Sequence, residues 1–141
     1  MDEILRQAER RDIADIQRVR HAVKENRLAS RVISDKEVAQ AIEVTGRGWV
    51  IEVEGRVQAF AIGNAETGNI FALFVDPGHE GRGYGRRLQD EMLRWLWSRG
   101  LKRLWLSTAP GTRAERFYES SGWVRRDLLS NGEVLFERHA T

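Results

Sequence analysis

The feature of this 141-residue chain that most constrains its fold is a glycine-rich turn between an apolar run and a helical pattern. The apolar run covers residues 70–75 and is typical of a buried strand, and the Asp-Pro-Gly sequence at 76–78 ends it. Gly81, Gly83 and Gly85 follow at alternate positions, directly before the helical pattern. Glycines at this spacing let the backbone adopt positive φ angles and approach a ligand closely.

The glycine turn and the helix behind it predict a binding site for a phosphate group. The first turn of a helix has unpaired N–H groups and the positive end of the helix dipole, and both favour an anion. Arg82, Arg86 and Arg87 add positive charge at this point. No lysine follows the glycines, which argues against a Walker A loop. Three predicted strands precede the turn, and no acidic residue ends the strand after the helix, which argues against a dinucleotide-binding unit.

The periodicity of the apolar residues predicts the order β-α-α-β-β-β, the glycine turn, and then α-β-α-β-β. We expect strands at 4–8, 49–54, 57–62, 69–75, 101–107, 123–128 and 134–137. We expect helices that begin after Asp12 and after Ser34, and two more at 85–99 and 114–119. Because a helix separates the strands at 69–75 and 101–107, these two should be parallel neighbours.

Polar residues mark the expected ends of the first two helices. Asp12 is in position to cap the first helix, which should end near residues 26–28. Ser34 and Glu37 have the spacing of a capping box at the start of the second helix.

Composition limits the classes of function. The 23 Lys and Arg residues are nearly balanced by 21 Asp and Glu, and the arginines are scattered apart from the group at 82–87, which is not typical of a nucleic-acid binder. No apolar run approaches the roughly 18–20 residues of a membrane span, and the N-terminus does not resemble a signal peptide. The chain has no cysteine, and His21, His79 and His139 lack the spacing of metal ligands. We therefore expect one cytoplasmic domain over residues 1–141, with no metal, no nucleic-acid partner and no membrane partner.

Two segments together carry a resemblance to a known family. Residues 80–85 correspond to a motif Gln/Arg-x-x-Gly-x-Gly/Ala, with Glu80 in place of the Gln or Arg. Residues 114–123 correspond to a second motif, Ala-x-x-Phe-Tyr-x-x-x-Gly-Phe/Trp. With these motifs in this order, the chain resembles the GNAT superfamily of acetyl-CoA-dependent N-acetyltransferases over essentially its whole length. The resemblance implies an α+β (α/β) fold, with a mixed central sheet of about six or seven strands, a splayed central pair and about four flanking helices.

The same resemblance implies acetyl-CoA as co-substrate, bound where the strand ending at Val75 separates from the strand at 101–107. Its pyrophosphate would lie on the N–H groups of residues 82–86. The implied cofactor-binding residues are Leu73, Phe74, Val75, Glu80, Gly81, Arg82, Gly83, Tyr84, Gly85, Arg86 and Phe117. Because Glu80 carries a negative charge, we expect its side chain to point away from the pyrophosphate.

The resemblance also implies a catalytic acid, Tyr118, which would protonate the thiolate that leaves. A phenol can do this, because its ordinary pKa of about 10 is near the value of about 8.5 for a thiol. The general base stays open between Glu52, Glu54 and a chain of water molecules.

The resemblance further implies that the acceptor is a primary amine of a small molecule, peptide or protein, which would attack acetyl-CoA directly in a ternary complex. We expect residues 25–34 and the hairpin at 128–135 to recognise the acceptor. The carboxylates of Glu25 and Asp35 would suit an amine, or they serve only as helix-cap and surface residues. The alternative function is a coenzyme A-binding sensor without catalysis. Leu93 and Trp97 lie off the apolar face of the helix at 85–99, which predicts either a homodimer interface or a second packing contact.

Overall fold

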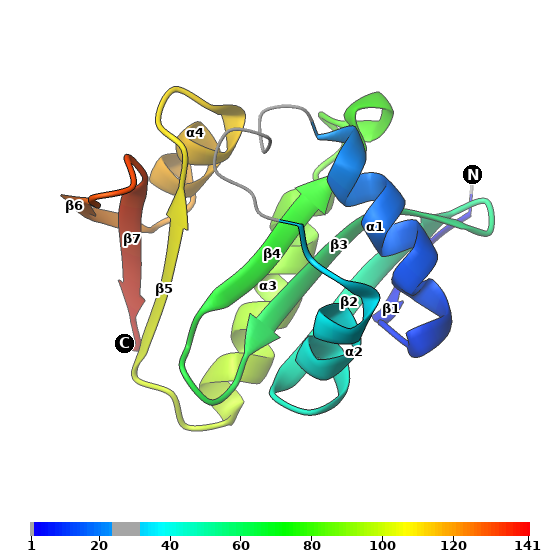
Figure 1. The fold of residues 1–141 in the computed structure, drawn as a ribbon, viewed down its shortest axis with the longest axis horizontal. Coiled ribbons are helices and arrows are strands. Elements are labelled where there is room, and N and C mark those ends of the chain that lie inside the picture. Colours follow the sequence, from blue (N-terminus) through cyan, green and yellow to red (C-terminus); the bar gives the residue numbers. More distant parts are fainter. Residues whose placement is uncertain (1, 24–31) are drawn as a thin grey trace.

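The computed structural model describes residues 2–23 and 32–141 and confirms the mixed fold, which contains two antiparallel sheets (Figure 1). The first sheet has the order β1-β2-β3-β4 and comprises β1 (Glu3–Gln7), β2 (Gly46–Val53), β3 (Arg56–Asn64) and β4 (Ile70–Val75). The second has the order β5-β7-β6 and comprises β5 (Arg103–Thr108), β6 (Val124–Leu128) and β7 (Val134–His139). The helices are α1 (Ile13–Ala22), α2 (Asp35–Glu43), α3 (Tyr84–Ser98) and α4 (Arg113–Ser120), with short 3-10 helices η1 (Arg10–Asp12) and η3 (Pro77–His79). The predicted end of the first helix, at 26–28, lies outside the described residues.

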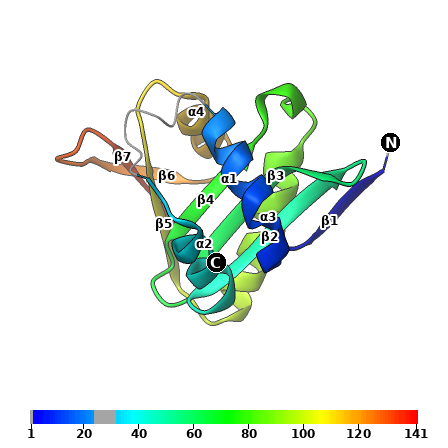
Figure 2. The ribbon, with the colours of Figure 1, turned by 45° about the vertical axis from the view of Figure 1, so that its right-hand side comes forward.

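Helices cover both faces of the first sheet, which explains the unbroken apolar runs of its strands. Along β2, Trp49 and Ile51 pack in the core beneath α3, whereas Val50 packs in the core beneath α1 and α2. Because neighbouring residues of a strand point to opposite faces, a strand between two helical layers is apolar at successive positions. Figure 1 shows α1 and α2 in front of this sheet and α3 behind it, and Figure 2 shows the same layers after rotation.

β4 and β5 join the two sheets at one end and then separate. They run parallel, as predicted, and a bridge pairs Asn69 with Trp105. Just beyond this bridge Phe71 is an extra residue in β4, because Ile70 and Ala72 pair with adjacent residues of β3. Such a bulge bends a strand and increases its twist. Figure 1 shows β4 and β5 diverging toward their carboxyl ends, which confirms the splayed central pair.

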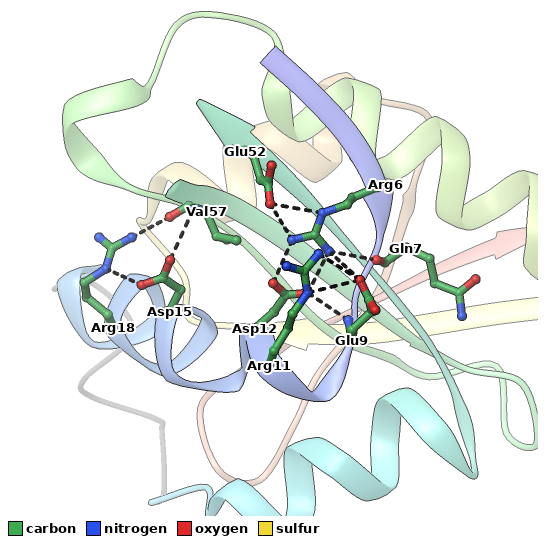
Figure 3. Close-up of polar contacts among 9 residues, drawn as sticks. All are labelled: Arg6, Gln7, Glu9, Arg11, Asp12, Asp15, Arg18, Glu52 and Val57. Atoms are coloured by element: carbon green, nitrogen blue, oxygen red, sulfur yellow. Dashed lines mark hydrogen bonds and ion pairs between the residues drawn. The ribbon is translucent and has the colours of Figure 1, made fainter. Parts of the chain in front are cut away.

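The start of α1 differs from the prediction that the Asp12 side chain caps this helix. Asp12 precedes α1, but its carboxylate accepts hydrogen bonds of 2.8 Å from the guanidinium of Arg6 and of 2.8 Å from the backbone N–H of Glu9 (Figure 3). Arg6 also donates to Glu52 at 2.6 Å. We call Arg6, Glu9, Asp12 and Glu52 the Arg6 cluster; it ties η1 to β1 and β2. Burial alone would raise the pKa of Asp12, but the hydrogen bonds from Arg6 and Glu9 outweigh it and lower that pKa.

A second polar group holds α1 against β3. The carboxylate of Asp15 accepts a hydrogen bond of 3.2 Å from the backbone N–H of Val57, and Arg18 donates to the carbonyl oxygen of the same residue (Figure 3). Arg18 also lies 3.8 Å from the carboxylate of Asp76, the residue that follows β4. The helix is therefore connected to the segment that leads into the glycine turn.

Of the two alternatives predicted for Leu93 and Trp97, the packing of α3 shows the second packing contact. This side chain is 6% exposed and lies in the chain's own core, and Trp97 packs half-buried against the same core. The reason is that α3 contacts residues of both sheets, including Leu104 and Phe136 of the second, so a wider arc of the helix is buried. In the described part of the chain, no helix is both long enough and apolar enough to cross a membrane.

Candidate functional site

A cavity of about 830 Å³ opens where β4 and β5 separate. Its walls come from β4, the glycine turn, the first turn of α3, the end of β5 and α4, with Ala22 and Val23 at the end of α1. Small-molecule sites typically have volumes of about 300–1,000 Å³. The predicted site residues that line this cavity are Leu73, Phe74, Val75, Glu80, Gly81, Gly83, Tyr84, Gly85, Arg86, Phe117 and Tyr118.

One wall of the cavity is an edge of β4. Leu73, Phe74 and Val75 pair with β3 on one side. On the other side, no strand in the described residues pairs with them, because β5 has already turned away. An edge of this kind presents backbone N–H and C=O groups that can bind an extended ligand as an added strand.

The way in which α3 begins makes the glycine turn a candidate site for an anion. Gly83 precedes the helix with φ +81°, a conformation that strains other residues. The hydrogen bond from the N–H of Arg87 to the carbonyl oxygen of Gly83 (3.1 Å) starts the helical ladder, so the N–H groups of residues 84–86 precede it. The first turn of α3 has no acidic residue. An anion in the cavity would therefore meet N–H groups and the positive end of the helix dipole.

Gly85 brings α3 close to the opposite wall. A Cβ atom at this position would lie 3.5 Å from the ring of Phe117 and 3.7 Å from the side chain of Leu73. The small residue thus lets the start of α3, α4 and β4 surround one space.

The carboxylate of Glu80 has a partner on the other wall. Its Oε2 atom lies 3.3 Å from Nε of Arg113, the first residue of α4, and both residues line the cavity. The ion pair directs the carboxylate across the cavity toward α4. Since both side chains are substantially exposed, the pair lies at the cavity rim and is screened by solvent.

Two of the predicted cofactor residues have side chains turned elsewhere. Tyr84 is 1% exposed and its hydroxyl donates a hydrogen bond of 2.6 Å to Glu3 in β1. That hydrogen bond and burial raise the pKa of Tyr84. Because the side chain is buried and its hydroxyl is already bonded to Glu3, only the backbone of Tyr84 is left to bind a ligand. Arg82 is not among the lining residues, and it lies close enough to Tyr84 and Glu3 to affect their pKa values.

Tyr118 lies on the α4 wall. Its ring packs at 5.2 Å from that of Phe117 and 5.7 Å from that of Trp123, centroid to centroid, which holds it in one orientation. Burial raises the pKa of Tyr118, so the phenol stays protonated at neutral pH. No described residue makes a hydrogen bond with its hydroxyl, which leaves that group available to a ligand in the cavity.

The structure also places in the cavity two side chains to which the sequence assigned no definite role. Glu133, from the hairpin between β6 and β7, accepts a hydrogen bond of 2.7 Å from the hydroxyl of Ser107 at the end of β5. His79 lines the wall at the glycine turn and lies 3.2 Å from the carboxylate of Asp76. Nothing in the local sequence joins Glu133 to Ser107, which is 26 positions away; only the register between β5 and β7 brings them together.

Of the carboxylates proposed from the sequence, the three that the structure describes lie outside the cavity lining. Glu52 belongs to the Arg6 cluster, Glu54 is at the turn between β2 and β3, and neither lines the cavity. Asp35, at the start of α2, accepts a hydrogen bond of 3.3 Å from Gln17 in α1, and Glu25 lies outside the described residues.

Comparison with known proteins agrees with this geometry. The sequence model of the acetyltransferase (GNAT) family matches residues 7–123. Over 82 residues the chain is 38% identical to the mycothiol acetyltransferase of Beutenbergia cavernae, a match that covers 54% of this chain and 28% of that protein. Over 80 residues it is 35% identical to the ribosomal protein bS18-alanine N-acetyltransferase of Escherichia coli (strain K12), covering 55% of this chain and 54% of that protein. These matches span about half or less of the length of either relative.

The fold has a close counterpart among solved structures. The PaiA N-acetyltransferase of Thermoplasma acidophilum, solved in complex with coenzyme A, superposes with a TM-score of 0.84 at 13% identity, covering 99% of this chain and 100% of that one. At this level of identity the likeness concerns the fold alone. Because the family match extends over most of the sequence, the chain belongs to the acetyltransferase (GNAT) family.

Proposed function

We propose that this protein transfers an acetyl group from acetyl-CoA to a primary amine, by direct attack of the amine in a ternary complex. The observation that carries this proposal is that a free edge of β4, the N-terminus of α3 and the hydroxyl-bearing ring of Tyr118 line one cavity. Coenzyme A has matching parts: phosphates for a helix N-terminus, pantetheine amides for a strand edge, and beyond the amides a terminal sulfur for the ring of Tyr118. Residues 1–141 would act as a single acetyltransferase domain.

The residues that would hold the co-substrate divide the cavity into two ends. The phosphate end consists of the glycine turn at 81–85 with the first turn of α3, where backbone N–H groups would bind the pyrophosphate. The acyl end consists of Tyr118, Ser107 and Glu133. Leu73, Phe74 and Val75 lie between the two ends and would pair with the pantetheine amides.

Tyr118 supplies a proton at the acyl end. When bound, acetyl-CoA would bring an activated thioester to this ring. A buried phenol is a weaker acid than one in water, but the same burial raises the proton affinity of a thiolate beside it. The two pKa values therefore shift in the same direction, and the hydroxyl remains a competent donor.

The names of the two relatives above bear on which amine is the acceptor. They mention two different compounds, an alanine of ribosomal protein bS18 and mycothiol. In either class of acceptor, a protonated primary amine must lose a proton before it can attack a thioester.

A thiol-release assay with acetyl-CoA tests the proposal. The purified chain is incubated with peptides that begin with alanine, with small primary amines and with lysine, and free coenzyme A is measured against a blank without amine. We expect amine-dependent release with at least one acceptor, and a product heavier than the acceptor by one acetyl group. Coenzyme A binding without turnover on any amine would favour the alternative, a sensor without catalysis.

A further inference from the structure

We propose that Glu133 is the group that receives the acceptor: its carboxylate binds the protonated amine and takes its proton. Ser107 holds Glu133 in place. The proposal deepens the acetyltransferase function above and rests on it. It assigns the general base to a residue of the hairpin between β6 and β7.

The register of the second sheet places Glu133 on the opposite side of the sheet from Tyr118. Leu106 pairs with Phe136, and both lie in the core that includes Tyr118. Ser107 is the next residue along β5 and therefore points to the other face. Because Ser107 donates a hydrogen bond to Glu133, that carboxylate lies on this other face as well. An acceptor at Glu133 would then reach a thioester between the two sheets from the side opposite to the acid.

The hydrogen bonds of Glu133 leave one of its oxygens free. The hydroxyl of Ser107 (2.7 Å) and the side-chain amide of Asn131 (3.3 Å) both donate to Oε1. In residues 2–23 and 32–141, Oε2 accepts no hydrogen bond and Glu133 forms no ion pair. The carboxylate is thus fixed through Oε1, and Oε2 is left without a donor in a residue that lines the cavity.

Within the described residues, Glu133 differs in this respect from the other glutamate of the cavity. Glu80, the other glutamate that lines the cavity, is paired with Arg113. A partly buried carboxylate that lacks a cation is suited to a cationic ligand, because the ligand would supply the missing charge.

The charged groups around Glu133 are mostly committed to other partners. On β6, Arg125 pairs with Glu115 and Arg126 pairs with Glu137. On β5, Arg103 also pairs with Glu137. Among the described residues, the other charged or titratable ones that line the cavity are His79, Glu80, Tyr84, Arg86, Arg113, Arg116 and Tyr118, from the glycine turn, α3 and α4. Of residues 2–23, the near end of α1 contributes Ala22 and Val23 to this cavity.

Proton transfer during the reaction involves only the amine, the leaving sulfur, Glu133, Tyr118 and water. The ammonium gives one proton to Oε2 of Glu133, and the nitrogen lone pair forms a bond to the thioester carbonyl carbon. The bond from that carbon to sulfur then breaks, and the sulfur takes the proton of Tyr118. The nitrogen loses its second proton to water, the Tyr118 phenolate regains a proton from water, and Glu133 releases its proton to solvent. The net products are an N-acetyl amine, coenzyme A and one proton.

The variant Glu133→Gln tests this role, because glutamine keeps an oxygen that can accept from Ser107 but cannot take a proton. We expect kcat/KM for the amine at pH 7 to fall about 100-fold, the usual scale for a general base. The loss should shrink as pH rises toward the pKa of the amine, because the amine then arrives neutral. The control is Asp127→Asn on the same hairpin, which lies outside the cavity lining and should leave the pH profile unchanged. A loss of equal size at every pH would mean a structural role and overturn the proposal.

A binding measurement separates this proposal from the acetyltransferase function itself. Alanine amide, a primary ammonium, and lactamide, its neutral hydroxyl analogue, are titrated by NMR into the protein with coenzyme A present. We expect alanine amide to bind the wild type at least fivefold more tightly than Glu133→Gln, and lactamide to show no such difference. Equal binding of alanine amide by both proteins, or no binding to the wild type, would overturn the role of Glu133 whether or not thiol release occurs.

Discussion

The phosphate end of the cavity is built from backbone, whereas the acyl end is built from side chains of three separate segments. At the phosphate end, Gly83 and the N–H groups of residues 84–86 form one continuous piece of chain. At the acyl end, Tyr118 comes from α4, Ser107 from β5 and Glu133 from the hairpin before β7.

This difference determines what each end can tolerate. A backbone site depends on φ angles and on the absence of side chains, so substitutions should act on binding. A side-chain site depends on functional groups, so substitutions should act on the chemical step while the coenzyme still binds. Variants at the two ends should therefore differ in whether they change coenzyme A binding or turnover.

The largest effect is expected for Tyr118→Phe. The phenylalanine ring keeps the contacts with Phe117 and Trp123 but loses the proton donor. We expect kcat to fall by about 100-fold or more, with KM for acetyl-CoA within about twofold of the wild type. Steady-state kinetics measures both constants. A rise in KM with unchanged kcat would place Tyr118 in binding rather than in proton transfer.

The Arg6 cluster offers a comparison outside both ends, where polar residues support only the fold. Asp12→Asn leaves the half-buried Arg6 with one anionic partner fewer, and we expect a loss of about 2 kcal/mol in the free energy of unfolding at pH 7. Because the pKa of Asp12 is lowered by folding, its contribution is present above the unfolded value of about 3.9 and is lost as pH falls through the folded value. The variant and the wild type should therefore converge in acid. Urea unfolding from pH 7 to pH 3 measures this, and a difference that stays constant would contradict it.

A smaller effect is expected at the phosphate end for Gly83→Val. The side chain must adopt φ +81°, and we expect the dissociation constant for coenzyme A to rise about tenfold, because a strain of about 1–2 kcal/mol disturbs the turn. The matched control is Gly100→Val, at φ +89° after α3, which carries similar strain but lies outside the cavity lining. Calorimetric titration measures the affinity. Equal weakening by both variants would mean that the glycine turn acts only through general stability.

The smallest effect is expected for Glu80→Gln. Removing a negative charge at the rim of a phosphate site should tighten coenzyme A binding a few-fold at low salt, and the gain should fade near 0.5 M salt. The control is Glu119→Gln, which removes an exposed carboxylate paired with Arg125, outside the cavity lining. If Glu80→Gln weakened binding instead, the ion pair with Arg113 would be a required part of the site.

The sequence predicted the glycine turn, the helix behind it and most of the fold, because these follow from local patterns. The glycine spacing and the helix after it predicted the turn, and the capping box at the start of α2 is present, with hydrogen bonds between Ser34 and Glu37 in both directions. The splay of β4 and β5 followed from the family resemblance, and the structure adds its physical basis, the bulge at Phe71.

Other features could not be predicted, because they depend on contacts between distant segments. The position of Asp12 in the sequence predicts a helix cap. In the structure its carboxylate instead accepts hydrogen bonds from the guanidinium of Arg6. A helix with a single apolar face would leave Leu93 outside the core. Because α3 contacts two sheets, Leu93 is buried instead. Glu133 carries no local signal, and only the pairing of β5 with β7 brings it beside Ser107.

The central claim is that the co-substrate lies between the separated strands β4 and β5, and backbone hydrogen exchange tests it most directly. Exchange is measured by mass spectrometry with and without a saturating amount of coenzyme A. The account predicts slower exchange for the amides of residues 73–75 and 84–86, with β6 unchanged. Unchanged exchange in both of these segments, or protection confined to β6 and β7, would contradict it.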